Sequence, residues 1–222
     1  MYWIAALTSA AAVGVGGMFY LKHYFSDKEV KTTPRQRKIF IIAACAFYVV
    51  TSVLMALFVS EDDSTVLAFA RDIFLMHCLL YLAVIDYKLK VIPNKAVLVM
   101  LGVSVALVVA QTLVEGYPQY ILVDAGIGCL VAGGMFLVVN LLSRNGMGMG
   151  DVKLMAVAGI CLGINKILGL IFWSLVVSVI TGIILMIAKK KTIKSSLPLA
   201  PFFLIGSLVS NALYIISGIS EV

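Results

Sequence analysis

The sequence predicts an all-α, polytopic integral membrane protein, a helical bundle of about eight transmembrane helices. Of the 222 residues, 62% are hydrophobic and only 13% are charged, whereas soluble domains average roughly half apolar and about a quarter charged residues. The apolar residues fall into runs of the length that crosses a hydrocarbon core of about 30 Å. We therefore expect one membrane-embedded domain, 1–222, in contact with the lipid bilayer.

The apolar runs give the expected helices in chain order. They cover residues 1–21, 39–59, 66–85, 96–114, 120–142, 147–164, 167–188 and 197–219. The basic segment 22–38 between the first two is expected to be a short polar loop. The sixth run needs its own argument, because Val152 to Ile164 alone is shorter than the roughly 17–25 residues that usually span. A start near Met147 gives 18 residues, or about 27 Å of helix.

The basic residues predict the orientation in the membrane. If the sixth run crosses, 15 of the 17 Lys and Arg residues lie in loops on one side, and only Arg71 and Lys166 lie on the other. The positive-inside rule assigns the basic side to the cytoplasm, which leaves both termini outside. The net charge of +6 is then a feature of topology, and no nucleic-acid partner is expected.

The predicted topology brings two acidic residues to the same membrane face. Asp86 follows the third helix, Asp151 begins the sixth, and the two helices between them cross the membrane out and back. An ionisable residue at membrane depth is costly and therefore indicates a functional site. Two carboxylates that share a site do not both ionise readily, so one can act as a base on water while the other acts as an acid, without a metal. Acids in membranes also serve ion pathways, so this spacing alone leaves both uses open.

The residues around the two acids carry a resemblance. Gly148-Met149-Gly150-Asp151 resembles the GxGD motif of membrane aspartic proteases. The longer stretch Gly146–Lys153, with Asp86 and Ile92-Pro93-Asn94 upstream, resembles the type IV prepilin peptidase family and its preflagellin-processing relatives. The stretch 198–202, Pro-Leu-Ala-Pro-Phe, is similar to a late Pro-Phe-Gly-Pro-Phe pattern in that family, with two of its five residues changed. The similarity extends over about residues 66–203.

This resemblance implies an aspartic endopeptidase with Asp86 and Asp151 as its catalytic pair. Its substrates would be prepilins, pseudopilins or preflagellins, cut after a basic leader at the cytoplasmic face of the inner or plasma membrane. The further motif or substrate-binding candidates are Pro93, Gly148, Gly150, Lys153, Pro198 and Pro201. No metal and no cofactor are expected for proteolysis. S-adenosylmethionine would be needed only for methylation of the new N-terminus, and that activity stays open because segment 22–38 lacks the zinc-binding cysteine insert of many relatives.

Other interpretations remain beside this one. An ion-coupled transporter could use Asp72, Asp86, Asp124 and Asp151. It would need inverted repeats, which the sequence does not show, and broken helices at the membrane midplane, whereas the glycine-rich break is expected at the membrane edge. An inactive relative could assist pilus assembly, although both acids are intact. Asp72 and Asp124 are expected near the outer face, where they could pair with Arg71. His77 is expected to be a buried hydrogen-bonding residue, and Gly159-x-x-x-Gly163 is expected to allow close helix packing.

Overall fold

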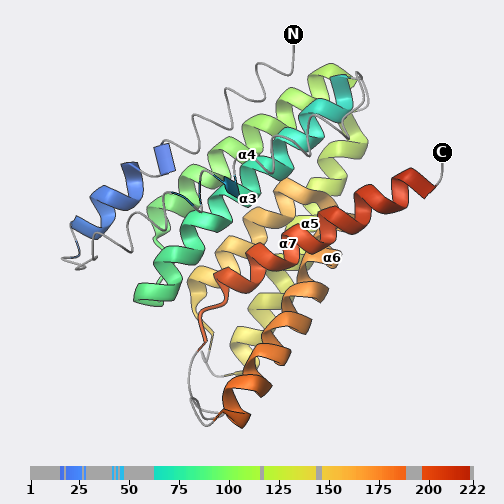
Figure 1. Cartoon of the computed structure of the whole chain (residues 1–222). Coiled ribbons are helices and arrows are strands. Elements are labelled where there is room, and N and C mark those ends of the chain that lie inside the picture. The colour runs from blue at the N-terminus through green and yellow to red at the C-terminus, as the bar shows by residue number, and fades with distance from the viewer. Residues whose placement is uncertain are drawn as a thin grey trace.

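The computed structural model describes most of the chain from residue 63 onward. The described residues are 16–17, 19–26, 28, 42, 44, 46–47, 63–115, 118–143, 147–188 and 197–220. Within these ranges the chain is helical and contains no strand, as predicted. The elements are α3 (Asp63–Leu89), α4 (Asn94–Glu115), α5 (Pro118–Leu142), α6 (Met149–Ile187) and α7 (Ala200–Ser220). Figure 1 shows these helices packed in one bundle.

The protein is an integral membrane protein with several apolar helices. Four described helices, α3 to α6, are long and apolar enough to cross a membrane. Most of the first two predicted helices and most of the predicted loop 22–38 lie outside the described residues. The count of eight helices and the outside location of both termini therefore stay predictions.

Helix α6 is broken at Gly163. This glycine has φ 73° and ψ 179°, a backbone conformation that side chains other than hydrogen strongly disfavour. The break divides α6 into a first arm, 149–162, about 21 Å long, and a second arm, 164–187, about 36 Å long. At the start of the second arm the Ile164 N–H donates to Asp124 Oδ1 at 3.0 Å. Asp124 thus satisfies a backbone donor that the break exposes.

Contacts between neighbouring helices show that the two arms of α6 run in opposite directions. The first arm is antiparallel to α5, because Gly128 lies against Gly159 and Gly133 lies against Ala156. At Gly128 and Gly159 a Cβ on either residue would meet the backbone of the other. The predicted close packing at Gly159 is therefore confirmed. Gly163 also lies close to α5, because a Cβ on Gly128 would lie 2.9 Å from its carbonyl carbon, but the pattern did not indicate that α6 breaks at this residue.

The second arm of α6 lies antiparallel to α7. Gly169 faces Ser210, and Ser174 faces Gly206 further along the pair. Helix α7 starts beside Asp86 and passes Lys166 at Ser210, so it runs in the same direction as the first arm. The chain therefore reverses at the end of the first arm and returns along α7. The sequence predicted a separation of two helices near residues 165–166, and the structure places it slightly earlier, at Gly163.

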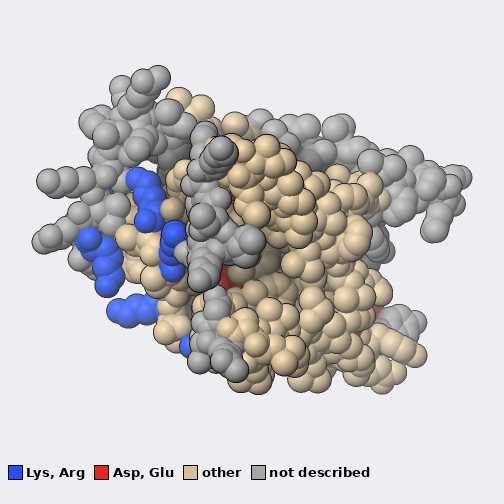
Figure 2. All heavy atoms as spheres, turned by 90° about the horizontal axis from the view of Figure 1, so that it is seen from below, with Lys and Arg blue, Asp and Glu red and all other residues tan. Residues whose placement is uncertain are grey.

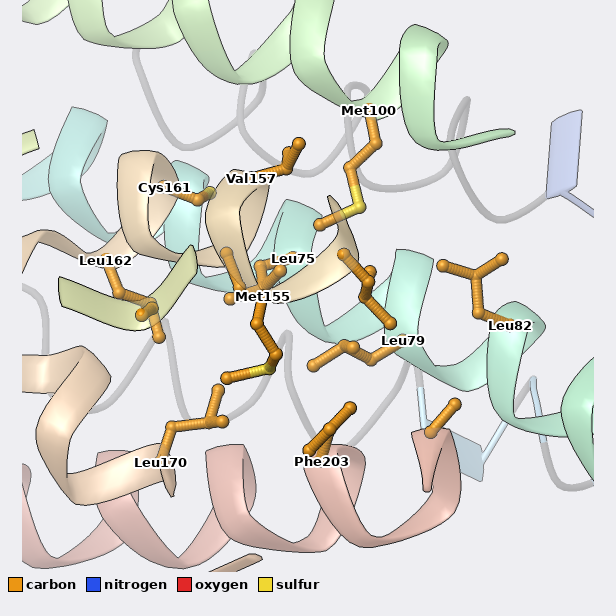
Figure 3. Close-up of a cluster of buried hydrophobic side chains, with 14 of the residues drawn as sticks. Leu75, Leu79, Leu82, Met100, Met155, Val157, Cys161, Leu162, Leu170 and Phe203 are labelled. Atoms are coloured by element: carbon orange, nitrogen blue, oxygen red, sulfur yellow. The ribbon is translucent and has the colours of Figure 1, made fainter. Parts of the chain in front are cut away.

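The first arm of α6 forms the centre of the bundle. Its side chains Leu154, Met155 and Cys161 are fully buried. Figure 3 shows that Met155 lies among side chains from three other helices and from the second arm of α6: Leu75 and Leu79 of α3, Met100 of α4, Phe203 of α7 and Leu170 of the second arm. The position of this arm is therefore set by packing on several sides.

Two helix ends differ from the sequence prediction. Helix α3 continues to Leu89 instead of ending at Ile85, so Asp86 lies within its last turn. Residues 19–26 are helical, although a loop was expected from Lys22 onward. Leu21 packs with Tyr81 and Ile85 of α3, which explains why the helix continues: its apolar face is covered at that point.

Candidate active site

Asp86 is held in the last turn of α3, immediately before a tight reversal of the chain. The Lys90 N–H donates to the Asp86 carbonyl oxygen at 2.8 Å, and Lys90 has a φ of 51°. A residue in this left-handed conformation commonly ends a helix. The reversal buries Ile92 and Pro93 and leads directly into α4 at Asn94.

The Asp86 side chain is buried and contacts the start of α7. Its Oδ2 accepts a hydrogen bond from the Ala200 N–H at 3.0 Å, and the Leu199 N–H also donates to the carboxylate. The first amides of a helix have no partner inside the helix, and a carboxylate there is favoured by the helix dipole. Asp86 therefore fixes the segment that contains Pro198 and Pro201 to the end of α3.

Asp151 lies in the first turn of α6, at the same end of the bundle. Its N–H donates to the Gly148 carbonyl oxygen at 3.0 Å, and its side chain lies within electrostatic range of Asp86. Its Oδ1 is buried and has no hydrogen-bond partner among the described residues. The two acids that the topology was predicted to bring together are thus neighbours in space.

The two glycines before Asp151 are needed for close approach. A Cβ on Gly148 would lie 3.1 Å from Asp151 Oδ2, and a Cβ on Gly150 would lie 2.9 Å from the Cβ of Ile92. Gly148 has a φ of −68°, a value that any residue can adopt, so glycine is not required there by a left-handed backbone conformation. Gly148 and Gly150, two of the substrate-binding candidates, thus lie against the Asp151 carboxylate and Ile92.

A side-chain bond links the two acidic motifs at the surface. Lys153 Nζ donates to Asn94 Oδ1 at 3.1 Å, and both residues are exposed. Other lysines at this end, including Lys88 and Lys95, are also exposed. Figure 2 shows Lys and Arg side chains gathered on one part of the face seen from below, beside a small acidic area set among uncharged residues. The acids therefore lie at a basic end of the bundle.

A second group of charges lies at the opposite end. Asp72 precedes Asp86 by about 21 Å along α3, and its Oδ2 accepts a hydrogen bond from Lys166 Nζ at 2.7 Å. The ion pair of Asp72 is thus formed with Lys166 and not with Arg71, while Asp124 binds the Ile164 N–H. The four acids that a transporter would use are divided between two separate ends.

The structure also identifies contacts that sequence patterns did not indicate. Asn140 of α5 is buried and donates from Nδ2 to the Met147 carbonyl oxygen at 2.5 Å. In the sequence, the only indication of this contact was a polar Asn near the end of an apolar run, a few residues before the glycine-rich segment. His77 is buried and its Nδ1 bonds the Ile73 carbonyl oxygen at 2.8 Å, which confirms the prediction for it. No group of three or more His, Cys, Asp or Glu residues that could hold a metal lies in the described part of the chain.

A curated protein is similar to part of this chain. The chain is 29% identical over 133 residues to the prepilin leader peptidase/N-methyltransferase of Bacillus subtilis (strain 168). The aligned part is 60% of this chain and 51% of that relative, so the chain matches about half the length of the curated relative. No solved structure matches the chain.

A family model provides the assignment. It is described as the type IV leader peptidase family, and it matches residues 73–186. This range contains both acids, the Ile92-Pro93-Asn94 segment and the glycine-rich motif, and it is more than half of the 222 residues. The chain belongs to the type IV leader peptidase family.

Proposed function

We propose that this protein is a membrane aspartic endopeptidase that removes the basic leader from type IV prepilins or prepilin-like proteins. The observation that carries the proposal is the meeting of Asp86 and Asp151 at one end of the bundle. The unpartnered buried Oδ1 of Asp151 supports it, because such an atom in a native protein calls for an explanation such as a catalytic role.

The chemistry needs only the two carboxylates and a water molecule. One carboxylate takes a proton from water as the water oxygen attacks the scissile carbonyl carbon. The other, protonated, carboxyl group stabilises the developing charge on the carbonyl oxygen, and a proton passes to the leaving nitrogen as the C–N bond breaks. Asp86 is held by the amides of Leu199 and Ala200, so its position does not depend on substrate.

The exposed lysines favour a cytoplasmic location for this site. Lys88, Lys90, Lys95 and Lys153 all lie at the end that carries the two acids, and basic residues at the ends of membrane helices face the cytoplasm. The prepilin class of substrate rests on the family and on the name of the Bacillus relative. Proteolysis by this pair requires no cofactor, and S-adenosylmethionine would enter only if the protein also methylates the new N-terminus.

The test is cleavage of a purified prepilin by detergent-solubilised protein. Asp86→Asn and Asp151→Asn should each reduce the cleavage rate at least about 100-fold, the usual contribution of a general acid or base. In Asp86→Asn the amide oxygen can still accept from the Ala200 N–H, so the start of α7 keeps its partner. A loss of rate with an unchanged thermal midpoint then reports chemistry and not unfolding.

Asp124→Asn is the matched control. It makes the same change in an acid at the opposite end and keeps an acceptor for the Ile164 N–H, so cleavage should persist. If the Asp86 and Asp151 variants cut as fast as the wild type, the catalytic assignment is wrong. If the wild type cuts none of several prepilins, the proposed substrate class is wrong.

A further inference from the structure

Asn140 is a buried polar residue that lies beside the candidate active site without being one of its acids. It is 2% exposed and lies near the end of α5, which finishes at Leu142. Its Nδ2 donates to the Met147 carbonyl oxygen at 2.5 Å. The backbone carbonyl oxygen of Asn140 accepts a hydrogen bond from Ser143 Oγ at 3.1 Å. Asn140 therefore joins the end of α5 to the residue that precedes the glycine-rich motif.

Packing fixes the first arm of α6 from Gly150 onward, whereas residues 147–149, which lead into it, have few polar restraints among the described residues. Gly148 stands at the N-cap position and makes no side-chain capping bond. Gly148 and Gly150 lose more conformational freedom on ordering than any other residue type would. The Lys153–Asn94 bond is exposed, and exposed polar links of this kind contribute little. The buried bond from Asn140 is the stronger restraint.

The restraint acts directly on the position of Asp151. The Met147 carbonyl group is one residue before Gly148, and the Gly148 carbonyl oxygen accepts from the Asp151 N–H. A shift of residue 147 would therefore be passed to Asp151 within a single turn, whereas Asp86 is fixed separately by α7. The Asn140 bond is therefore one of the contacts that act on the position of Asp151 but not on that of Asp86.

We propose that Asn140 is a positioning residue for the cleavage reaction, holding Met147 so that Asp151 stays in register with Asp86. Its catalytic consequence rests on the proposed function. The restraint itself does not, and it is measurable without substrate. Asn140 touches neither the acids nor the peptide in this role, so its loss should reduce kcat while KM stays nearly unchanged.

The experiment compares Asn140→Leu with Asn211→Leu in detergent. Leucine keeps the approximate volume and removes the donor. Asn211 is the matched control, because it is also a buried Asn whose Nδ2 donates to a backbone carbonyl oxygen, but that oxygen belongs to Ser207 of its own helix. Asn140→Leu should lower kcat about 10- to 100-fold, the scale expected for small misplacements of a catalytic group, and change KM by less than about threefold.

Amide hydrogen exchange provides the readout that does not require activity. In Asn140→Leu, exchange should accelerate in residues 147–152 and remain at the wild-type rate in α4 and α7. Asn140→Gln, which retains an amide donor, should recover part of the protection and part of kcat; it also serves as the test if the leucine variant does not fold. Unchanged exchange at residues 147–152, or a loss of kcat equal to that in Asn211→Leu, would overturn the proposal. If the wild type cleaves no prepilin, the exchange result still decides whether Asn140 fixes this segment.

Discussion

Replacement of Gly150 by alanine tests how closely the two acidic motifs must pack. An added Cβ would lie 2.9 Å from the Cβ of Ile92, whereas ordinary contacts begin at 3.4 Å. The neighbouring segment must therefore move by about 0.5 Å, the difference between these two distances. A change of rotamer cannot relieve the contact, because the Cβ of Ile92 is attached directly to the backbone.

The movement should affect activity more than stability. Overpacking of this kind costs about 1–3 kcal/mol, and alanine in a helix recovers about 1 kcal/mol relative to glycine. The net destabilisation is then about 0–2 kcal/mol. Ile92 is only a few residues from Asp86, so a shift there alters the spacing of the two carboxylates. We expect a 10- to 100-fold reduction in kcat, on the order produced by ångström-scale misplacement.

The assay is prepilin cleavage together with the thermal midpoint in detergent. Gly134→Ala is the control, since a Cβ at that position of α5 meets nothing within 4 Å. It should stabilise by up to about 1 kcal/mol and leave cleavage unchanged. Equal cleavage rates and equal midpoints for the two alanine variants would refute the argument that Gly150 is required for close approach.

The remaining predictions concern the end of the bundle that carries Asp72, Lys166 and Gly163, opposite the two candidate catalytic acids. Lys166→Met leaves the Asp72 carboxylate without its ion-pair partner and should destabilise by about 3–5 kcal/mol, seen as a lower thermal midpoint with normal cleavage per folded molecule. The double variant Lys166→Met with Asp72→Asn should be destabilised less than Lys166→Met alone. Equal thermal midpoints for the single and the double variant would contradict this prediction. Gly163→Ala places a side chain at φ 73° and against Asp124, so it should cost at least about 1–2 kcal/mol. Gly126→Ala is the control and should cause no such loss, because a Cβ at that position meets nothing within 4 Å. Equal thermal midpoints for the two variants would show that the break tolerates a side chain.

The parts of the fold that the sequence predicted well are those set by hydropathy. The apolar runs 96–114 and 120–142 correspond closely to α4 (Asn94–Glu115) and α5 (Pro118–Leu142). The location of Asp86 and Asp151 at the same end of the bundle was also predictable, because it follows from counting crossings; their closeness within that end required the structure. Each crossing reverses the chain, so the end of one helix and the start of another three later must share a face.

The contacts that sequence analysis missed depend on partners from distant elements. The break at Gly163 requires an acceptor for the Ile164 N–H, and Asp124 of α5 supplies it. A glycine four residues after Gly159 is equally consistent with helix packing, so the local pattern could not distinguish the two uses. The pairing of Asp72 with Lys166 likewise became visible only once α3 and α6 were placed side by side.

The short first arm of α6 explains why polar residues are concentrated at both ends of the bundle. An arm of about 21 Å is shorter than a hydrocarbon core of about 30 Å, so at least one of its ends lies below the membrane surface. Backbone groups at that depth must be satisfied inside the protein. Asp124 does this where the arm ends, and Asn140 holds the segment where it begins.

The same constraint bears on the candidate active site. Asp151 occupies the first turn of this short arm, so its carboxylate can lie at a depth where a helical substrate would have no exposed backbone to offer. Under the proposed function, cleavage there would require an extended stretch of peptide, which can exchange main-chain hydrogen bonds with its surroundings. A substrate that is cut beside its apolar segment, and not within it, would then need the least unwinding of its helix at membrane depth.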